Sequence, residues 1–232
     1  KHRSKHHTDF STIISSTKEK DRIIYTFKEA SRDLERNDFK QQDVAAPWLY
    51  IGSLMGKSFE IGKEIVRETK SSILFNPSLY LARKGKNYLK PILSRTTILV
   101  LNLEEAQAVL DVKSGKTENL LRELHQLGPQ IVIITNGEKR LYAFHENIIY
   151  SLIPPKVKIV HTAGAGDAFT AGFLAGLIKK YSFEDALRLG QVNALSVIQH
   201  IGCKNKLLKE KEAIKMMKKY KIKISTHKKR QP

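Results

Sequence analysis

The chain has 232 residues, 41% of them hydrophobic and 28% charged, and its 41 Lys and Arg residues outnumber 23 Asp and Glu residues, so its formal net charge is +18. This composition is typical of a globular protein and not of a disordered chain. The apolar runs are too short for a membrane span. The single cysteine, Cys203, excludes an internal disulfide and a CxxC metal or redox site. With no apolar secretory segment recognisable, we expect a cytoplasmic location.

Positive charge is concentrated toward the C-terminal end. Residues 204–232 contain twelve Lys or Arg residues and two acidic residues, a net charge of +10. One interpretation is an anionic partner such as nucleic acid, bound through its phosphates. The other is a solvated helix over residues 210–220 with a frayed end, which we favour because no aromatic platform or DNA-binding motif accompanies the charge. Near the other end, His2, His6 and His7 resemble a metal-binding tract only superficially and are expected to be exposed and not metal-binding.

Short apolar runs alternate with amphipathic segments along most of the chain. Two β-rich runs, residues 10–16 and 22–27, flank a polar stretch at 17–21 and predict a hairpin. Further strands are expected at residues 48–51, 72–75, 97–101 and 130–135, with a second hairpin, at the sheet edge, from residues 141–144 and 148–153. Helices are expected at residues 59–69, 79–93, 103–110 and 118–126, and in two long segments from Ala168 to the basic tail. This order predicts an α/β fold with a mostly parallel sheet covered on both faces.

One phosphate-binding motif is incomplete. The segment Gly52-Ser-Leu-Met-Gly56-Lys57-Ser58 follows a predicted strand and precedes a helix, as a Walker A loop does. Only three residues, in place of four, separate its first glycine from Gly-Lys-Ser, and no strand ends in a Walker B aspartate. We therefore interpret it as a tight turn between a strand and a helix.

The strongest functional signal is the segment His161-Thr-Ala-Gly-Ala-Gly-Asp-Ala-Phe169. Its small residues let the backbone approach a ligand closely, and the helix that follows points unpaired amides and a positive dipole end at the same place, which favours an anion. Asp167 lies at this helix start, where the dipole should keep it ionised. A carboxylate there can accept the proton of an attacking hydroxyl. The alternative is a glycine-rich turn with an Asp cap, followed by small residues that allow close helix packing.

This segment resembles the signature D-T-x-G-A-G-D-x-F of the ribokinase-like, or PfkB, family of carbohydrate and nucleoside kinases, and six of its seven specified positions match. Asn102 and Glu105 are similar to the family's N-x-x-E motif, and Thr135 and Gly137 to its T-x-G turn. Residues 194–202 resemble the helix and glycine turn that close the adenine pocket. The matches extend over about residues 10–208, in the family's order.

The resemblance implies a three-layer α/β/α ribokinase-like fold and transfer of the ATP γ-phosphoryl group to a hydroxyl of a sugar or nucleoside, with Mg²⁺ and with ATP as co-substrate. It implies these roles: Asp167 as general base; Ala163, Gly164, Ala165 and Gly166 as the anion hole; Asn102, Thr135, Gly137 and Asn193 at the nucleotide; and Glu105 at Mg²⁺, through water. Each set also has a structural alternative. Asn102 and Glu105 can form a capping box, Thr135 and Gly137 a β-turn, and Asn193 can face solvent from a helix.

Two features depart from the family. His161 replaces an aspartate that helps to bind a monovalent cation, and a neutral imidazole cannot replace that hard oxygen ligand, which puts activation by K⁺ in doubt. The family's upstream strand-helix unit, which holds the sugar hydroxyls, has no counterpart here. The chain thus resembles a C-terminal portion of a family member, and we expect it to be inactive by itself.

The resemblance also suggests three parts. Residues 1–46 would be a lid hairpin and its connection, residues 47–208 the nucleotide-binding kinase core, and residues 209–232 a basic helix and tail. Because the family's lid often pairs two subunits, the resemblance is compatible with a homodimer that forms through the lid. The alternative function, which is not enzymatic, is that of a protein that binds anions or nucleic acid through the Lys-rich tail.

Overall fold

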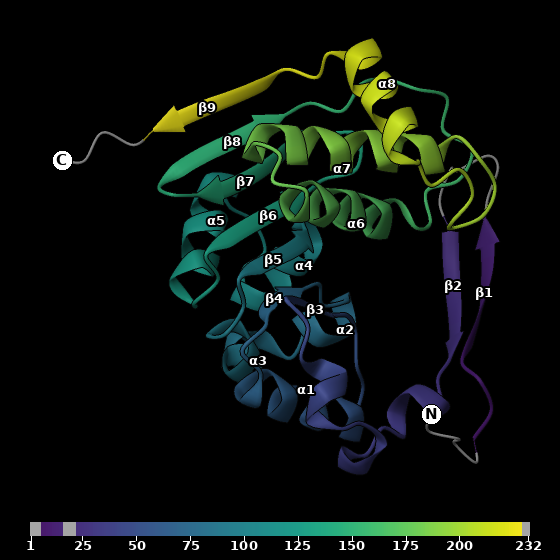
Figure 1. Cartoon of the computed structure of the whole chain (residues 1–232), viewed down its shortest axis with the longest axis vertical. Coiled ribbons are helices and arrows are strands. Elements are labelled where there is room, and N and C mark those ends of the chain that lie inside the picture. The colour runs from purple at the N-terminus through teal and green to yellow at the C-terminus, as the bar shows by residue number, and fades with distance from the viewer. Residues whose placement is uncertain (1–5, 16–21, 229–232) are drawn as a thin grey trace.

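The computed structural model describes residues 6–15 and 22–228 (Figure 1). Its strands are β1 (Phe10–Ser15), β2 (Arg22–Phe27), β3 (Trp48–Ile51), β4 (Ser72–Phe75), β5 (Ile98–Asn102), β6 (Ile131–Thr135), β7 (Leu141–His145), β8 (Ile148–Leu152) and β9 (Ile224–Lys228). Its α-helices are α1 (Lys57–Glu68), α2 (Leu79–Ala82), α3 (Gly85–Leu93), α4 (Leu103–Leu110), α5 (Thr117–Gln126), α6 (Ala165–Ile178), α7 (Phe183–Ile198) and α8 (Glu210–Tyr220). Short 3-10 turns, η1 (Ala30–Arg32), η2 (Arg36–Asp38) and η3 (Gln41–Val44), connect β2 to β3.

A seven-stranded sheet forms the centre of the body, with its strands in chain order from β3 to β9. The strands β3, β4, β5 and β6 pair in parallel, and β7, β8 and β9 are added antiparallel. The helices between the parallel strands provide the crossovers that this pairing needs. The carboxyl ends of β4, β5 and β6 therefore meet at one edge of the sheet, where ligands of open α/β sheets bind. No helix in the described part of the chain is long and apolar enough to cross a membrane.

Alternate residues of the central strands face two separate cores. In β5, Leu99 and Leu101 pack in the core that α1, α3, α4 and α5 cover, whereas Ile98 and Val100 pack in the core under α6, α7 and α8. A strand buried on both faces needs apolar side chains at every position, which is why these strands are continuous apolar runs in the sequence. The predicted three-layer α/β/α arrangement is confirmed.

The helices α6 and α7 lie side by side (Figure 1) and pack with their backbones in contact. A methyl group added at Gly190 would lie 2.7 Å from the carbonyl oxygen of Phe169, and one at Gly176 would lie 2.8 Å from the Cα atom of Ala186. The small residues that follow Asp167 therefore serve close packing, as one of the two interpretations of that segment expected.

The predicted frayed end is wrong for residues 224–228. The helix α8 has the predicted bounds, but β9 follows it and pairs antiparallel with β8, with Ile224 opposite Leu152. Ala213 of α8 and Ile222 before β9 are 2% and 4% exposed. A large part of the basic tail thus belongs to the folded body, and the β7–β8 hairpin does not form the edge of the sheet.

Two helix predictions also need correction. The helix predicted over residues 79–93 is interrupted between α2 and α3, and Gly85, the first residue of α3, has a positive φ of 77°. The helix after the glycine-rich segment begins at Ala165, three residues before the predicted start at Ala168. This earlier start places the glycine-rich segment itself in the first turn of α6.

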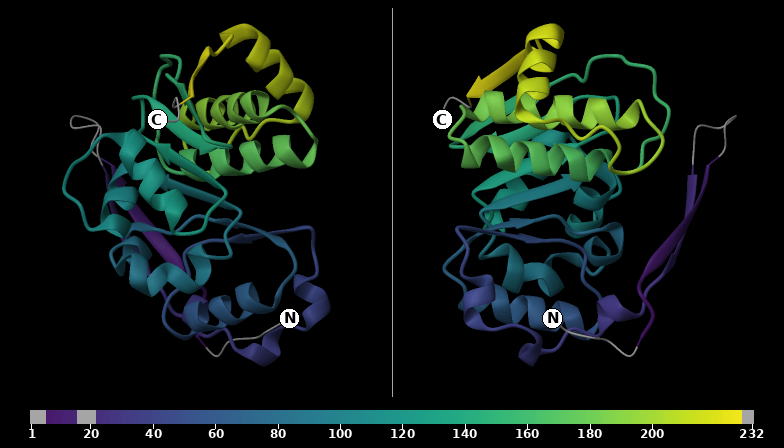
Figure 2. Two further views of the ribbon diagram at one scale, coloured as in Figure 1. Left: turned by 90° about the vertical axis from the view of Figure 1, so that its left-hand side faces the viewer. Right: turned by 45° about the vertical axis from the view of Figure 1, so that its right-hand side comes forward.

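The strands β1 and β2 form a separate hairpin that stands away from the body (Figure 2). The apolar side chains of Phe10, Ile14, Ile23 and Tyr25 are 59%, 56%, 59% and 60% exposed. At the hairpin base, Asp9 Oδ1 accepts the backbone N–H groups of Glu29 and Ser31. The two predicted strands are confirmed, whereas the polar stretch at 17–21 lies outside the described residues. His2 also lies outside them, and His6 and His7 are exposed.

The Walker A-like segment forms a turn that packs against the connecting segment. Gly56, at φ 54°, precedes the first residue of α1. Lys57 Nζ pairs with Glu35 Oε1 at 2.6 Å, and the buried Ser58 hydroxyl accepts the Leu34 N–H at 3.0 Å. These side chains stabilise the turn, in agreement with its interpretation as a structural element.

Candidate active site

Three neighbouring parallel strands have a polar residue at their carboxyl end. Asn76 follows β4, Asn102 ends β5 and Thr135 ends β6, and all three line one cavity of about 990 Å³. Asn76 Nδ2 donates to the carbonyl oxygen of Val100 at 2.9 Å, and Thr135 Oγ1 donates to that of Leu101 at 3.3 Å. The strand ends thus form one polar wall of the cavity.

The glycine-rich segment forms the opposite wall and is anchored to α7. The N–H groups of Val160 and His161 donate to the carbonyl oxygen of Ile198, the last residue of α7, at 2.8 and 3.1 Å. Gly164 caps α6 at φ 85°, and a methyl group there would collide with the backbone carbonyl of Cys203. Only glycine fits this conformation and this contact. The position of the α6 start is therefore fixed by backbone contacts.

The first turn of α6 presents unpaired amides to the cavity. The first intrahelical hydrogen bond is the one from Ala168 N to the Gly164 carbonyl oxygen at 2.9 Å, so the amides of Gly166 and Asp167 have no acceptor within the helix. Nothing lies within 4 Å of the place where a Cβ atom of Gly166 would be. Free amides and the positive end of a 14-residue helix at an open cavity make a binding place for an anion.

Asp167 lies in this first turn and lines the same cavity. Partial burial raises the pKa of its carboxyl group above the usual value. The helix dipole was expected to favour the ionised form, and the structure gives the opposite direction, because loss of contact with water disfavours the charge more strongly. A raised pKa makes the carboxylate a stronger base.

Glu105 faces the same cavity from the first turn of α4. Its carboxylate accepts the Asn102 N–H at 2.9 Å, and Asn102 Oδ1 accepts the Glu105 N–H at 2.8 Å, so the predicted capping box is present. Burial raises the pKa of Glu105 to about 7, with smaller contributions from the charges of Glu104 and Asp167. Two carboxyl groups with raised pKa values thus share one cavity, an arrangement typical of functional sites.

Eight of the ten residues predicted for the site line this cavity: Asn102, Glu105, Thr135, Gly137, Gly164, Ala165, Gly166 and Asp167. Ala163 and Asn193 do not. Ala163 is buried, at 7% exposure. Asn193 is buried on α7, where its amide donates to the Ala168 carbonyl oxygen at 2.7 Å and accepts the Leu208 N–H at 3.0 Å. Both polar atoms of Asn193 are bonded within the protein, and the side chain does not face solvent.

The sequence analysis missed several residues of this region. Asn76 carried a signal, because it directly follows an apolar strand as Asn102 does. Lys139 lies in the turn that the T-x-G match marked, whereas Gln191 and Lys156 line the cavity from segments that gave no signal. Tyr50 Oη donates to Asn76 Oδ1 at 3.4 Å, and burial together with the charges of Asp167 and Glu105 raises the pKa of Tyr50 to about 12. This phenol therefore lies within electrostatic reach of both carboxyl groups.

The donor atoms of the cavity fit Mg²⁺ held jointly with a nucleotide. Asp167 and Glu105 offer carboxylate oxygens, and Mg²⁺ usually takes one or two carboxylates together with substrate phosphates and water. Among the residues described, no three His, Cys, Asp or Glu side chains gather closely enough to hold a metal by themselves. The arrangement suits a cation that enters with its phosphate ligand.

Comparison with known proteins identifies the family. The model of the pfkB family of carbohydrate kinases matches residues 2–210. The chain belongs to the pfkB family. The family that the glycine-rich segment suggested is thereby confirmed, and the match covers the hairpin, the parallel strands and both walls of the cavity.

Relatives and solved structures agree with membership of the pfkB family. The chain is 31% identical to an uncharacterized sugar kinase of Archaeoglobus fulgidus over 145 residues, which are 62% of this chain and 56% of the relative. It is 34% identical to a cytidine kinase of Thermococcus kodakarensis over 133 residues, 55% of this chain and 46% of that protein. A ribokinase of Thermotoga maritima has the same fold, with a TM-score of 0.79 at 20% identity over 91% of this chain and 70% of that one. The chain spans about half the length of the curated relatives it matches.

Proposed function

We propose that this pfkB family chain carries the nucleotide-binding and proton-accepting part of a kinase that transfers the γ-phosphoryl group of ATP to a hydroxyl of a sugar or nucleoside. One observation supports this most: the Asp167 carboxyl group lies in the first turn of α6, beside the free amides of Gly166 and Asp167, in the cavity that Glu105 and Asn102 also line. A base and an anion site are thereby adjacent.

In the proposed reaction the Asp167 carboxylate accepts the proton of the attacking hydroxyl. The bond from the γ-phosphorus to the bridging oxygen of ATP breaks as the bond to the acceptor oxygen forms, and ADP leaves. The amides of Gly166 and Asp167 stabilise negative charge on the transferred group. The raised pKa of Asp167 strengthens it as a base.

The rest of the cavity suits the nucleotide. Asn102, Thr135 and Gly137 lie along the ends of β5 and β6, where ATP would extend, and Ala194 and Leu195 of α7 offer apolar contact for its base. Glu105 would hold Mg²⁺ through water, and the ion would neutralise phosphate charge when bound. We leave Asn193 out of the proposed site, because both of its polar atoms are bonded within the protein.

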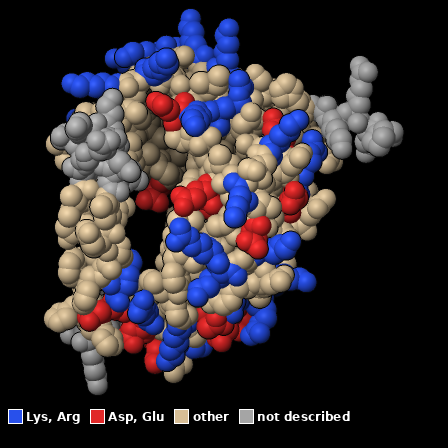
Figure 3. Space-filling model, turned by 180° about the vertical axis from the view of Figure 1, so that it is seen from behind, with Lys and Arg blue, Asp and Glu red and all other residues tan. Residues whose placement is uncertain are grey.

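The acceptor would bind on the β3 side of Asp167, near Tyr50 and Asn76. The relatives include proteins named as sugar, cytidine and adenosine kinases, and we propose the same broad acceptor class for this chain. In the space-filling view an open space separates the β1–β2 hairpin from the body (Figure 3), and the hairpin would act as a lid over the acceptor. Because His161 offers no hard oxygen ligand, we propose that K⁺ has little effect compared with Na⁺.

Replacing Asp167 with Asn tests the proposal, with Asp111→Asn as the matched control on an exposed helix end. In the chain with an upstream segment added, Asp167→Asn should lower turnover about 100-fold or more and leave the Kd for ATP almost unchanged, because it removes the proton acceptor and keeps the shape. Coupled ADP release over a panel of sugars and nucleosides, and calorimetry with an ATP analogue, measure the two quantities. If Asp167→Asn keeps the wild-type turnover, Asp167 is not the general base and serves only to cap the helix.

The 232-residue chain by itself is expected to bind ATP weakly and to transfer no phosphate, because it spans about half the length of its relatives and β3 lies at an edge of the described sheet. Turnover is therefore measured with the chain alone and with an upstream segment added. Strong acceptor-dependent ADP release from the chain alone would contradict this expectation.

A further inference from the structure

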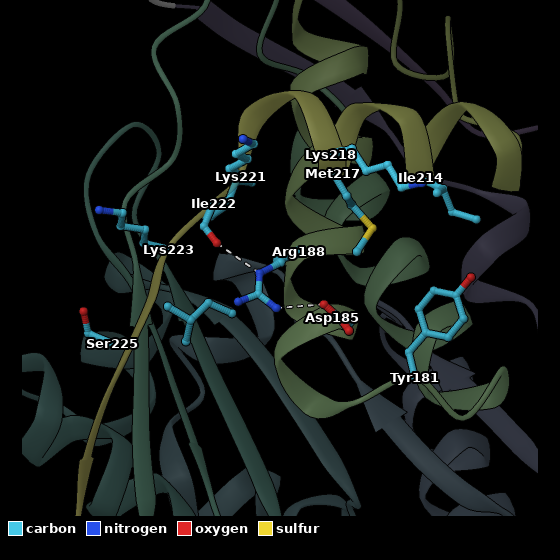
Figure 4. A pocket seen from close by; sticks show the side chains of 11 residues that line it. Tyr181, Asp185, Arg188, Ile214, Met217, Lys218, Lys221, Ile222, Lys223 and Ser225 are labelled. Carbon is cyan, nitrogen blue, oxygen red and sulfur yellow. Dashed lines mark hydrogen bonds and ion pairs between the residues drawn. The ribbon is translucent and has the colours of Figure 1, made fainter.

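A second hollow, of about 810 Å³, lies between α7, α8 and the segment that leads into β9 (Figure 4). None of its lining residues lines the nucleotide cavity. Asp185 and Arg188 belong to the first half of α7, Met217 and Lys218 to the last turns of α8, and Ile222 to the connection that follows. Its volume falls in the range of small-molecule sites.

The floor of this hollow is apolar. Ile214, Met217, Ile222 and Ile224 contribute to the lining, and Ile214 remains 37% exposed although it lies on the face of α8 that borders the hollow. Apolar surface in a concave place gains free energy when an apolar group of a ligand displaces water from it.

The rim of the hollow is basic. Lys218, Lys221 and Lys223 are exposed, and none of them takes part in an ion pair with another described residue. Asp185 is the acidic residue in the described lining, and Arg188 Nη1 holds its carboxylate at 2.7 Å. The lysine charges therefore remain available to an external anion.

The shape of the hollow is held by a hydrogen bond across it. Arg188 Nε donates to the carbonyl oxygen of Ile222 at 3.0 Å, which ties the connection after α8 to α7 (Figure 4). The Tyr181 hydroxyl, at the far end, donates to Glu210 Oε1 at 3.1 Å. Both walls are thus fixed by contacts within the protein, and a ligand would enter a site that already exists.

We propose that this hollow binds a small amphipathic anion, that is, an apolar chain or ring that carries one phosphate or carboxylate group. The apolar part would cover Ile214 and Met217, and the anionic group would lie at the rim near Lys221, with Lys218 and Lys223 on either side of it (Figure 4). A nucleic acid fits less well, because a polyanion needs a strip of charge and aromatic platforms, and the lining offers a single aromatic side chain, that of Tyr181.

Calorimetric titration of the whole chain with octyl phosphate, below its micelle concentration, tests the proposal independently of kinase activity. We expect saturable binding of one molecule. A triple variant, Lys218→Gln with Lys221→Asn and Lys223→Gln, should weaken it about 10-fold or more. Asn is chosen at Lys221 because this residue has a positive φ of 44°, which Asn tolerates.

The matched control removes the same charge from α8 outside the hollow. Lys211→Gln with Lys215→Gln and Lys219→Gln should leave the affinity for octyl phosphate within about 2-fold, because these residues do not line the hollow. Ile214→Ser tests the apolar part: it should weaken the binding of octyl phosphate and not that of inorganic phosphate.

Three results would overturn the proposal. Octyl phosphate could fail to bind saturably, the control triple could weaken binding as much as the hollow triple, or inorganic phosphate could bind as tightly as octyl phosphate. A single-stranded RNA oligonucleotide serves as the competing partner. Tight RNA binding that only the hollow triple abolishes, without binding of octyl phosphate, would assign the surface to nucleic acid instead.

Discussion

Asn102 and Glu105 hold each other in place at the carboxyl end of β5. Each accepts the backbone N–H of the other through its side chain, at 2.8 and 2.9 Å. The two bonds cap α4 and at the same time fix the Glu105 carboxylate at the cavity, where burial raises its pKa to about 7. Asn102 and Glu105 can therefore cap α4 and also act at the site. The raised pKa of Glu105 should make the free energy of unfolding depend on pH.

The free energy of unfolding of the metal-free protein should fall as the pH rises through the range in which Glu105 titrates. Folded Glu105 keeps its proton where the unfolded residue, with a pKa near 4.5, has lost it, so the folded state binds more protons between these values. Relative to Glu105→Gln, the wild-type protein should lose about 2 kcal/mol between about pH 5 and about pH 7. Urea unfolding at several pH values measures this difference, and Glu123→Gln, on an exposed part of α5, should leave the wild-type pH dependence in place.

Gly166→Ala should weaken ATP binding without loss of stability. The new methyl group would meet no protein atom within 4 Å and would project into the cavity where the phosphates are proposed to lie. We expect the Kd for an ATP analogue to rise about 10-fold or more, while alanine in the first turn of α6 stabilises the helix by up to about 1 kcal/mol. Calorimetry and thermal unfolding separate the two effects. Unchanged ATP affinity would mean that the phosphates lie elsewhere.

Gly190→Ala should have the opposite effect on stability. Its methyl group would lie 2.7 Å from the Phe169 carbonyl oxygen and 3.1 Å from the Phe169 ring, so α6 and α7 would have to separate. We expect the free energy of unfolding to fall by about 1–3 kcal/mol, although alanine is the better helix former. Urea unfolding measures the free energy of unfolding of Gly190→Ala, and the same measurement on Gly166→Ala provides the comparison. Equal stability of the two variants would show that the helices adjust without strain.

The exposed hairpin should mediate self-association. Ile14 and Ile23 lie opposite each other in the β1–β2 pair and are 56% and 59% exposed. Replacing both with Thr keeps β-propensity and removes apolar surface, so sedimentation should show a shift from dimer toward monomer. Ile201→Thr, at a 75% exposed position outside the hairpin strands, serves as the control and should not change the mass. A monomeric wild-type chain at all concentrations would contradict the prediction.

The sequence predicted best those elements whose local pattern and tertiary environment agree. β5 and β6 are uninterrupted apolar runs because both of their faces are buried, and the start of α4 is marked by a capping box that forms as expected. Asn102 and Thr135 were predicted from the family resemblance, and the structure places them at the ends of adjacent parallel strands. Asn76 obeys the same rule on β4 and was missed only because it matched no motif.

The sequence predictions were wrong where contacts between distant parts of the chain determine the structure. β9 has the sequence Ile-Ser-Thr-His-Lys in a Lys-rich region, and it is a strand because its backbone completes the hydrogen bonds of β8. Asn193 is a polar residue on a helix, and only the packing of α6 and of the segment before α8 around it shows that it is buried and bonded. The direction of the Asp167 pKa shift likewise depends on how much water the folded cavity admits.

The direct contact between α6 and α7 has a consequence for motion. At Gly190 and Gly176 no side chain separates the two backbones, so neither helix can slide along the other without collision. The pair should therefore open as one cooperative unit in hydrogen exchange, and the amides in its interior should exchange more slowly than those of the hairpin. The start of α6, where Gly166 and Asp167 lie, thus belongs to this closely packed helix pair, so we expect rearrangement of the cavity to come from the segments that surround it.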